Sequence, residues 1–146
     1  MTQEGKECIR LHFEVDGENF ASAGEASEAV KMKLKQLGVS PQTIRRVSIS
    51  MYEAEINMVI HAKGGEADVE IYDDRIELTL ADKGPGIPDV ELAMQDGYST
   101  APDYVRSLGF GAGMGFSNMK KYSDSLRVET EVGKGTTVRM TVFFND

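Results

Sequence analysis

The sequence predicts an α+β two-layer sandwich, in which helices cover one face of a mixed, mostly antiparallel sheet. Two long segments carry apolar residues at helical spacing, and several short segments pair around tight turns as antiparallel strands do. Size is the third observation, because 146 residues suit one domain with a sizeable core. We therefore expect a single domain over residues 1–146.

One strand and two helices are expected in the first half. Residues 8–15 alternate apolar and polar side chains, as a half-buried strand does. A helix is expected over residues 20–37, ended by Gly38, with apolar residues a turn apart: Ala26, Val30, Leu34 and Leu37. Ser40 and Pro41 suit the N-cap and first turn of a second helix, stopped by Gly64-Gly65, with this apolar stripe: Ile44, Val47, Met51, Ala54, Met58 and Ala62.

The second half of the sequence predicts four strands and one helix. Residues 67–72 and 75–81 read as strands joined by a turn at Asp73-Asp74. Residues 82–113 are irregular and form a loop too long to be idle in a compact domain. A helix over 115–122 precedes a closing hairpin of 126–131 and 136–144.

Composition excludes several function classes. A net charge of −8 disfavours nucleic acid or an anionic membrane as an electrostatic partner. The single cysteine, Cys8, allows no internal disulfide, which fits a reducing cytoplasm. The N-terminal residues lack the apolar core of a signal peptide, and no apolar run approaches the roughly 18 residues of a membrane span.

The second helix carries a polar pair beside its apolar stripe. Glu53 and Asn57 are four residues apart and share one face, about 100° around the helix from the stripe. The amide oxygen of Asn57 suits Mg²⁺, and a carboxylate one turn away can accept a proton from an attacking hydroxyl. A solvated helix edge explains the same pair when it is seen alone.

Two glycine-containing segments indicate a bound nucleotide. Asp82, Gly84 and Gly86 follow an apolar strand, where a carboxylate can accept a hydrogen bond while the backbone passes close to a ligand ring. Glycines at 109, 111, 113 and 115 precede a helix, whose first N–H groups and dipole favour phosphate. Each segment also fits an ordinary turn or hinge. The segment 133–137 lacks the upstream glycine of a P-loop and precedes a strand, so we interpret it as a hairpin turn.

Taken in order, these segments resemble the ATP-binding (Bergerat) fold shared by DNA gyrase B, the Hsp90 chaperones, histidine kinases and MutL. Within that superfamily the chain looks most like the stand-alone anti-sigma factor serine kinases of bacteria. Three stretches carry the closer resemblance: Asn57-Met-Val-Ile-His61, Gly113-Met114-Gly115-Phe116 and Gly133-Lys-Gly-Thr-Thr-Val138.

The resemblance implies a role for each candidate residue. Asn57 would ligate Mg²⁺ bridging the ATP phosphates, Glu53 would be the general base for a serine hydroxyl, and Asp82 would bind the adenine amino group. Residues 89–110 would form an ATP lid. The remaining nucleotide contacts would come from Gly84, Gly86 and Thr136 at the adenine and from Gly111, Gly113, Met114 and Gly115 at the phosphates.

The resemblance also implies partners. These are an anti-anti-sigma-like protein substrate, with a sigma factor and a second copy of the chain as further candidates. One place departs from the family, because Gly111-Ala112 stand where such kinases often have a cation, and Arg106 is the nearest one upstream. Two alternatives to a serine kinase therefore stay open: the ATP-binding module of a split histidine kinase, and a non-catalytic switch that binds ATP or ADP.

Overall fold

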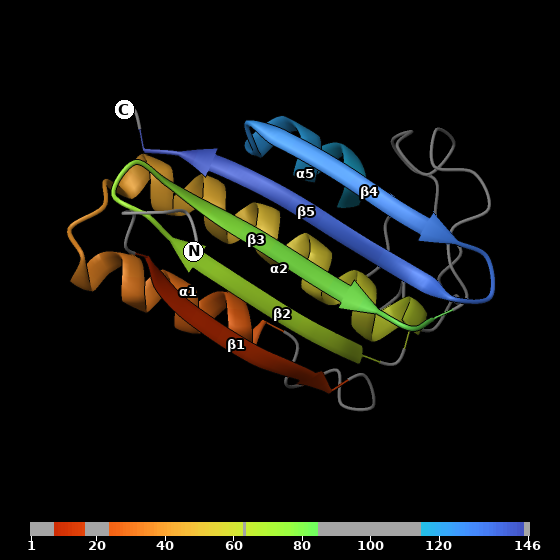
Figure 1. Ribbon diagram of the computed structural model, residues 1–146. Helices are drawn as coiled ribbons and strands as arrows, with labels where there is room; N and C mark the ends of the chain where they lie inside the picture. Colours follow the sequence, from red (N-terminus) through yellow and green to blue (C-terminus); the bar gives the residue numbers. More distant parts are fainter. Residues whose placement is uncertain (1–7, 17–23, 63, 85–114, 145–146) are drawn as a thin grey trace, which may run out of the picture.

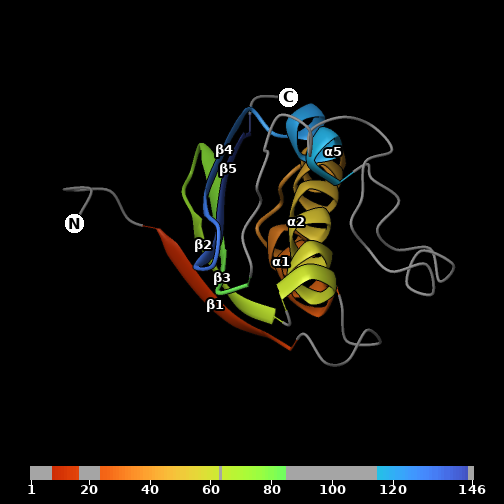
Figure 2. The ribbon, with the colours of Figure 1, turned by 90° about the vertical axis from the view of Figure 1, so that its right-hand side faces the viewer.

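The computed structural model describes residues 8–16, 24–62, 64–84 and 115–144, without the side chains of 60–62 and 115–117. Its strands form one antiparallel sheet in the order β1-β2-β3-β5-β4. Three helices, α1, α2 and α5, pack on one face of this sheet (Figures 1 and 2). The predicted α+β sandwich is therefore confirmed, and every strand pair in the described sheet is antiparallel. The elements are β1 (Ile9–Asp16), α1 (Glu25–Gln36), α2 (Pro41–Ala62), β2 (Gly64–Ile71), β3 (Arg75–Asp82), α5 (Gly115–Tyr122), β4 (Ser125–Glu131) and β5 (Gly135–Phe143).

The core lies between the sheet and the helices. Along β3, Ile76, Leu78 and Leu80 are buried, whereas the residues between them are only partly covered. Successive strand side chains point to opposite faces, so this alternation gives the sheet one apolar face under the helices and one open, polar face. The core is completed by residues from every neighbouring element, among them Val30, Leu34, Met51, Val69, Met119 and Met140.

Helix α2 crosses the centre of the sheet and follows its predicted pattern. Its stripe is buried at Ile44, Val47, Met51, Ala54 and Met58. The hydroxyl of Ser40 accepts the N–H of Thr43 at 3.3 Å, as an N-cap does, and Pro41 opens the helix. In α1 the predicted apolar residues are buried as far as Leu34. Leu37 is 45% exposed because the helix ends one residue before it.

The start of β2 differs from the prediction. Gly64 and Gly65 were expected to lie outside regular structure, but they are the first residues of β2. The reason is a close approach, because a Cβ on Gly65 would lie 2.3 Å from the carbonyl oxygen of Ala81 on β3. Glycine therefore stands in the strand because a neighbouring backbone needs the room.

Candidate functional site

The candidate residues gather at one end of the helix layer. The C-terminal half of α2, which carries Glu53 and Asn57, lies over the end of the sheet where β3 stops and β5 begins (Figure 1). Asp82 closes β3 and Thr136 is near the start of β5. Asp82 is two residues from the buried Leu80 on β3, and Thr136 is two residues from the buried Val138 on β5. Because side chains alternate along a strand, both residues lie on the face of the sheet that the helices cover.

The carboxylate of Asp82 is fixed by two backbone hydrogen bonds. Its Oδ1 accepts the N–H of Gly84 at 2.9 Å and the N–H of Thr136 at 3.1 Å. Among the residues that the structure describes, Oδ2 makes no hydrogen bond. Hydrogen bonds to Oδ1 thus fix the orientation of the side chain. Oδ2 remains able to accept a hydrogen bond from a donor such as the amino group of a nucleotide base.

The beginning of β5 fits tightly around Asp82. Gly135 has a φ of +129° and is buried, and a Cβ there would lie 2.2 Å from the carbonyl oxygen of Asp82. The next residue, Thr136, is 8% exposed, and its hydroxyl is 2.9 Å from that of Thr130 on β4. These contacts hold the ends of three strands in a fixed relation.

Glu53 links α2 to α5. Its Oε2 accepts a hydrogen bond from the side-chain amide of Asn118 at 3.0 Å, and both residues are partly buried. One turn further along α2, the side chain of Asn57 is also partly buried, and it makes no hydrogen bond within the described parts of the chain. Glu53, the predicted base, therefore has a hydrogen-bond partner in Asn118. The side-chain oxygen of Asn57, the predicted metal ligand, has none among the described residues.

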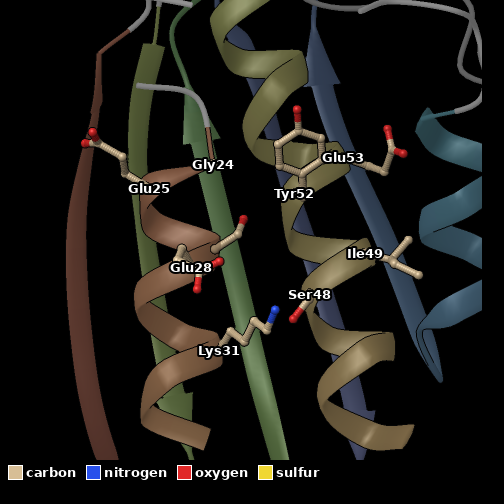
Figure 3. Close-up of a pocket in the computed structure, with 9 residues that line it drawn as sticks. Gly24, Glu25, Glu28, Lys31, Ser48, Ile49, Tyr52 and Glu53 are labelled. Atoms are coloured by element: carbon tan, nitrogen blue, oxygen red, sulfur yellow. The ribbon is translucent and has the colours of Figure 1, made fainter. Parts of the chain in front are cut away.

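A pocket of about 530 Å³ lies where α1 and α2 meet, and Glu53 lies on its border (Figure 3). Figure 3 shows Glu53 leaving α2 on the side of α5, whereas Tyr52 stands over the start of α1. Burial, with smaller contributions from the Glu53 and Glu55 carboxylates, raises the pKa of the Tyr52 phenol. The pocket is lined by Gly24, Glu25, Ser27, Glu28, Lys31, Ser48, Ile49, Tyr52 and Glu53.

Part of the predicted site falls outside the described residues. This holds for Gly86, Gly111, Gly113, Met114, Arg106 and the expected lid, and for the side chain of His61. Gly115 is described as the first residue of α5, where the phosphate-binding turn was expected. The structure thus pairs Asp82 with Thr136 and Glu53 with Asn118, and within the described parts no hydrogen bond joins the two pairs.

Two contacts of the site region were missed from the sequence. Asn118 gave no signal by itself, because an asparagine in a short helix is usually solvated. Glu55 did carry a signal, because it lies four residues after Met51 and three before Met58 and therefore falls on the apolar stripe. It is 2% exposed and binds the first turn of α1.

Comparison with known proteins identifies the class. Residues 43–146, which include all but the first two residues of α2, the described sheet from β2 onward and α5, match the family model of histidine kinase-, DNA gyrase B- and HSP90-like ATPases. The chain belongs to this class, whose members share an ATP-binding domain. Among the described residues, no helix is both long enough and apolar enough to cross a membrane.

Within this class the chain belongs to the family of the anti-sigma F factors. It is 37% identical to the anti-sigma F factor of Pasteuria penetrans over 139 residues, covering 90% of this chain and 87% of the relative. It is 36% identical to that of Clostridium botulinum (strain Eklund 17B / Type B) over 143 residues, covering 94% of both.

Solved structures share the fold. The RsbU and RsbW domains of a Mycobacterium tuberculosis protein superpose with a TM-score of 0.64 at 15% identity, over 94% of this chain and a third (33%) of that one. A mycobacterial sensor histidine kinase, MprB, gives a TM-score of 0.52 at 17% identity, over 92% of this chain and 97% of that one.

Proposed function

We propose that this protein is an anti-sigma regulator that binds Mg-ATP and phosphorylates a serine of a small anti-anti-sigma-like partner in the cytoplasm. The observation that carries the proposal is that the C-terminal half of α2, which carries Glu53 and Asn57, lies over the end of the sheet where Asp82 closes β3. Family membership supports ATP binding, and the anti-sigma F factors that the chain resembles support the regulatory role.

The nucleotide would be held by groups from the sheet and from the helices. Asp82 offers Oδ2 to the adenine amino group, and Thr136 and Gly84 lie beside it through their bonds to Oδ1. The amide oxygen of Asn57 fits Mg²⁺, which prefers a few neutral or anionic oxygens together with phosphates and water. When bound, the ion would neutralise charge on the phosphates, which this acidic chain needs.

Glu53 would act on the incoming serine. Its carboxylate takes the hydroxyl proton as the serine Oγ–phosphorus bond forms and the bond from phosphorus to the ADP oxygen breaks. In the structure this carboxylate accepts a hydrogen bond from Asn118, which keeps it pointed toward α5 and away from α1. Phosphoryl transfer needs mainly positioning and charge neutralisation. These residues would supply the positioning, and the Mg²⁺ held by Asn57 would supply the charge neutralisation.

The binding assignment is tested by nucleotide affinity. Asp82→Ala and Asn57→Ala should each weaken Mg-ATP binding by roughly 10- to 150-fold, because each removes a charge-assisted contact worth about 1.5–3 kcal/mol. Titration calorimetry measures the effect. Asp73→Ala in the turn between β2 and β3 and Gln42→Ala at the exposed start of α2 are matched controls that should bind as wild type. Equal affinities in all five proteins would remove both residues from the site.

The catalytic assignment is tested by transfer. Glu53→Ala should keep nucleotide binding and lose transfer by about 10²- to 10⁴-fold, the usual contribution of a general base. The assay uses ATP labelled at the γ-phosphate and extract of the source organism, with Glu129→Gln on the open sheet face as control. Acid-stable label indicates serine or threonine, and acid-labile label indicates the histidine kinase alternative. Transfer by Glu53→Ala at the wild-type rate would exclude Glu53 as the base.

A further inference from the structure

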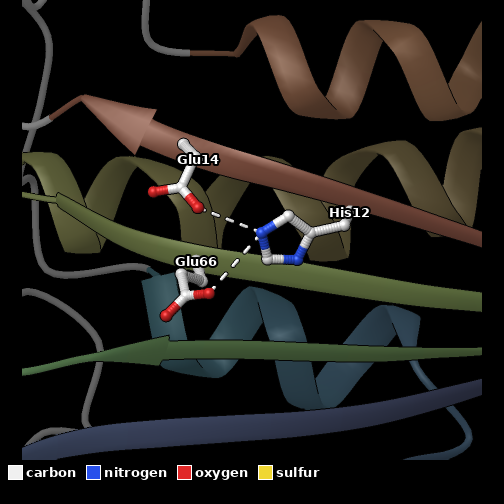
Figure 4. Close-up of side chains that lie close together, drawn as sticks. All are labelled: His12, Glu14 and Glu66. Carbon is white, nitrogen blue, oxygen red and sulfur yellow. Dashed lines mark hydrogen bonds and ion pairs between the residues drawn. The ribbon is translucent and has the colours of Figure 1, made fainter.

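The open face of the sheet carries a histidine surrounded by carboxylates. His12 and Glu14 on β1 stand directly across from Asp68 and Glu66 on β2. All four side chains are exposed, from 47% for His12 to 79% for Glu14. Figure 4 shows His12, Glu14 and Glu66 on the face away from the helices, and therefore away from the proposed nucleotide site. Asp68 is two residues from Glu66 on β2 and so lies on the same face.

Three ligand atoms converge in this cluster. The Nε2 of His12 is 3.0 Å from an oxygen of Glu14 and 3.5 Å from an oxygen of Glu66. The three atoms all lie within 4.8 Å of one another, and among the described residues this is the one group of its kind. A tetrahedral Zn²⁺ at about 2.0–2.2 Å from each ligand would hold them about 3.3–3.6 Å apart.

The fourth side chain orients the imidazole. The Nδ1 of His12 is hydrogen-bonded to Oδ1 of Asp68 at 2.7 Å. Nε2 is hydrogen-bonded to Glu14 at 3.0 Å and lies 3.5 Å from Glu66, so a metal ion would take the place of the proton between Nε2 and these carboxylates. A carboxylate on one ring nitrogen is the usual outer partner of a metal-bound histidine, because it fixes the ring and makes the other nitrogen a better ligand. Directly opposed carboxylates such as Glu14 and Glu66 also repel each other, and a cation between them relieves that repulsion.

We propose that His12, Glu14 and Glu66 form a binding site for a divalent transition-metal ion, with Zn²⁺ as the cation of best-fitting chemistry and Asp68 as the positioning residue. One imidazole nitrogen and two carboxylate oxygens suit Zn²⁺ better than Mg²⁺ or Ca²⁺, which take oxygen ligands. The exposed fourth position leaves room for water. Because the ligands come from both strands, the ion would fasten the edge strand β1 to β2.

The test is Zn²⁺ titration of the untagged full chain without nucleotide, so that its result does not depend on the proposed kinase. Calorimetry should show one ion per chain, and Co²⁺ should give the visible absorption of a four- or five-coordinate site. His12→Gln and Glu66→Gln should each weaken binding by ~10-fold or more, and Asp68→Asn by about 10-fold through lost orientation. Zn²⁺ should raise the melting temperature of the wild type and not of His12→Gln.

Two controls make the result specific. Glu129→Gln removes a carboxylate from the same face at the opposite edge of the sheet, and Cys8→Ser removes the sole thiol, so both should bind as wild type. Wild type that binds no Zn²⁺ would mean that the cluster holds only a proton, and this overturns the proposal. Equal affinity in wild type and His12→Gln would overturn it too, and Glu66→Gln decides the matter if His12→Gln does not fold.

Discussion

Asp82 shows how one side chain can be prepared for a ligand by the backbone around it. Two N–H groups, from Gly84 and Thr136, bind the same oxygen, so the carboxylate cannot turn without losing both bonds. Hydrogen bonds to an ionised acceptor are stronger than neutral ones, which makes this orientation firm. A bound base therefore meets an acceptor that is already in place and that has little conformational freedom to lose.

Among the described residues, His12 has a pKa shift that gives a definite pH dependence. Hydrogen bonds to Asp68 and then Glu14 raise its pKa to about 9, from 6.5. The folded state thus holds this proton more tightly than the unfolded state does. Its contribution to stability is fully present below about pH 6.5 and is lost as the pH rises through about 9.

In metal-free buffer, NMR should show the ring protons of His12 titrating near pH 9, and Asp68→Asn should lower the midpoint toward 6.5. The signal is assigned by its absence in His12→Gln, which separates it from His61, the other histidine of the chain. A wild-type midpoint at 6.5 would show that the carboxylates do not hold the proton.

At the scale of elements, α2 organises its neighbours through one buried acid. Glu55 accepts the backbone N–H groups of Gly24, Ala26 and Ser27 at 3.0–3.2 Å and the hydroxyl of Ser27 at 2.6 Å. Helix α1 has no side-chain cap of its own, since its N-cap is Gly24. A carboxylate from another helix therefore satisfies its free N–H groups and complements its dipole.

We expect Glu55→Ala to lower the free energy of unfolding by roughly 2–4 kcal/mol, because it leaves several buried donors without an acceptor. Glu28→Ala, which removes an exposed acid from the first turn of α1, should cost less than about 1 kcal/mol. Urea denaturation measures both values. If both variants lost the same free energy of unfolding, Glu55 would act only through its negative charge near the start of α1 and not through its hydrogen bonds.

The elements also show where sequence reading succeeds and where it stops. The stripe of α2, the Ser40-Pro41 start and the turn at 133–135 depend on residues close in sequence, and all three are found in the structure. Gly65 within β2 depends on the carbonyl of Ala81, which only strand pairing brings near. The pairing of Glu53 with Asn118 spans 65 residues and depends on how two helices pack. Local patterns predict elements, whereas these contacts need the assembled fold.

At the scale of the whole molecule, the described residues share one hydrophobic core between the sheet and the helices α1, α2 and α5. Met51 is 0% exposed at the centre of α2, whereas Met32 on α1 is 49% exposed. Met51→Ala should lower the free energy of unfolding by about 2–5 kcal/mol, through lost burial and the cavity that it leaves. Met32→Ala removes the same atoms from the surface and should change stability by less than about 0.5 kcal/mol. Chemical denaturation with two probes, one for helix and one for the tertiary environment, tests the comparison, and a small loss at Met51 would indicate a loosely packed core.

The hydrogen bond between Asn118 and Glu53 also gives the molecule an internal reporter. The side-chain amide of Asn118 donates a hydrogen bond to Oε2 of Glu53 at 3.0 Å, so the chemical shifts of its two protons respond to that acceptor. Ionised Glu53, protonated Glu53 and a carboxylate turned away toward another donor would each give a different shift. One side-chain amide peak on α5 can therefore be followed in solution as nucleotide or partner protein is added, and it shows whether Glu53 has left Asn118, without any attached label.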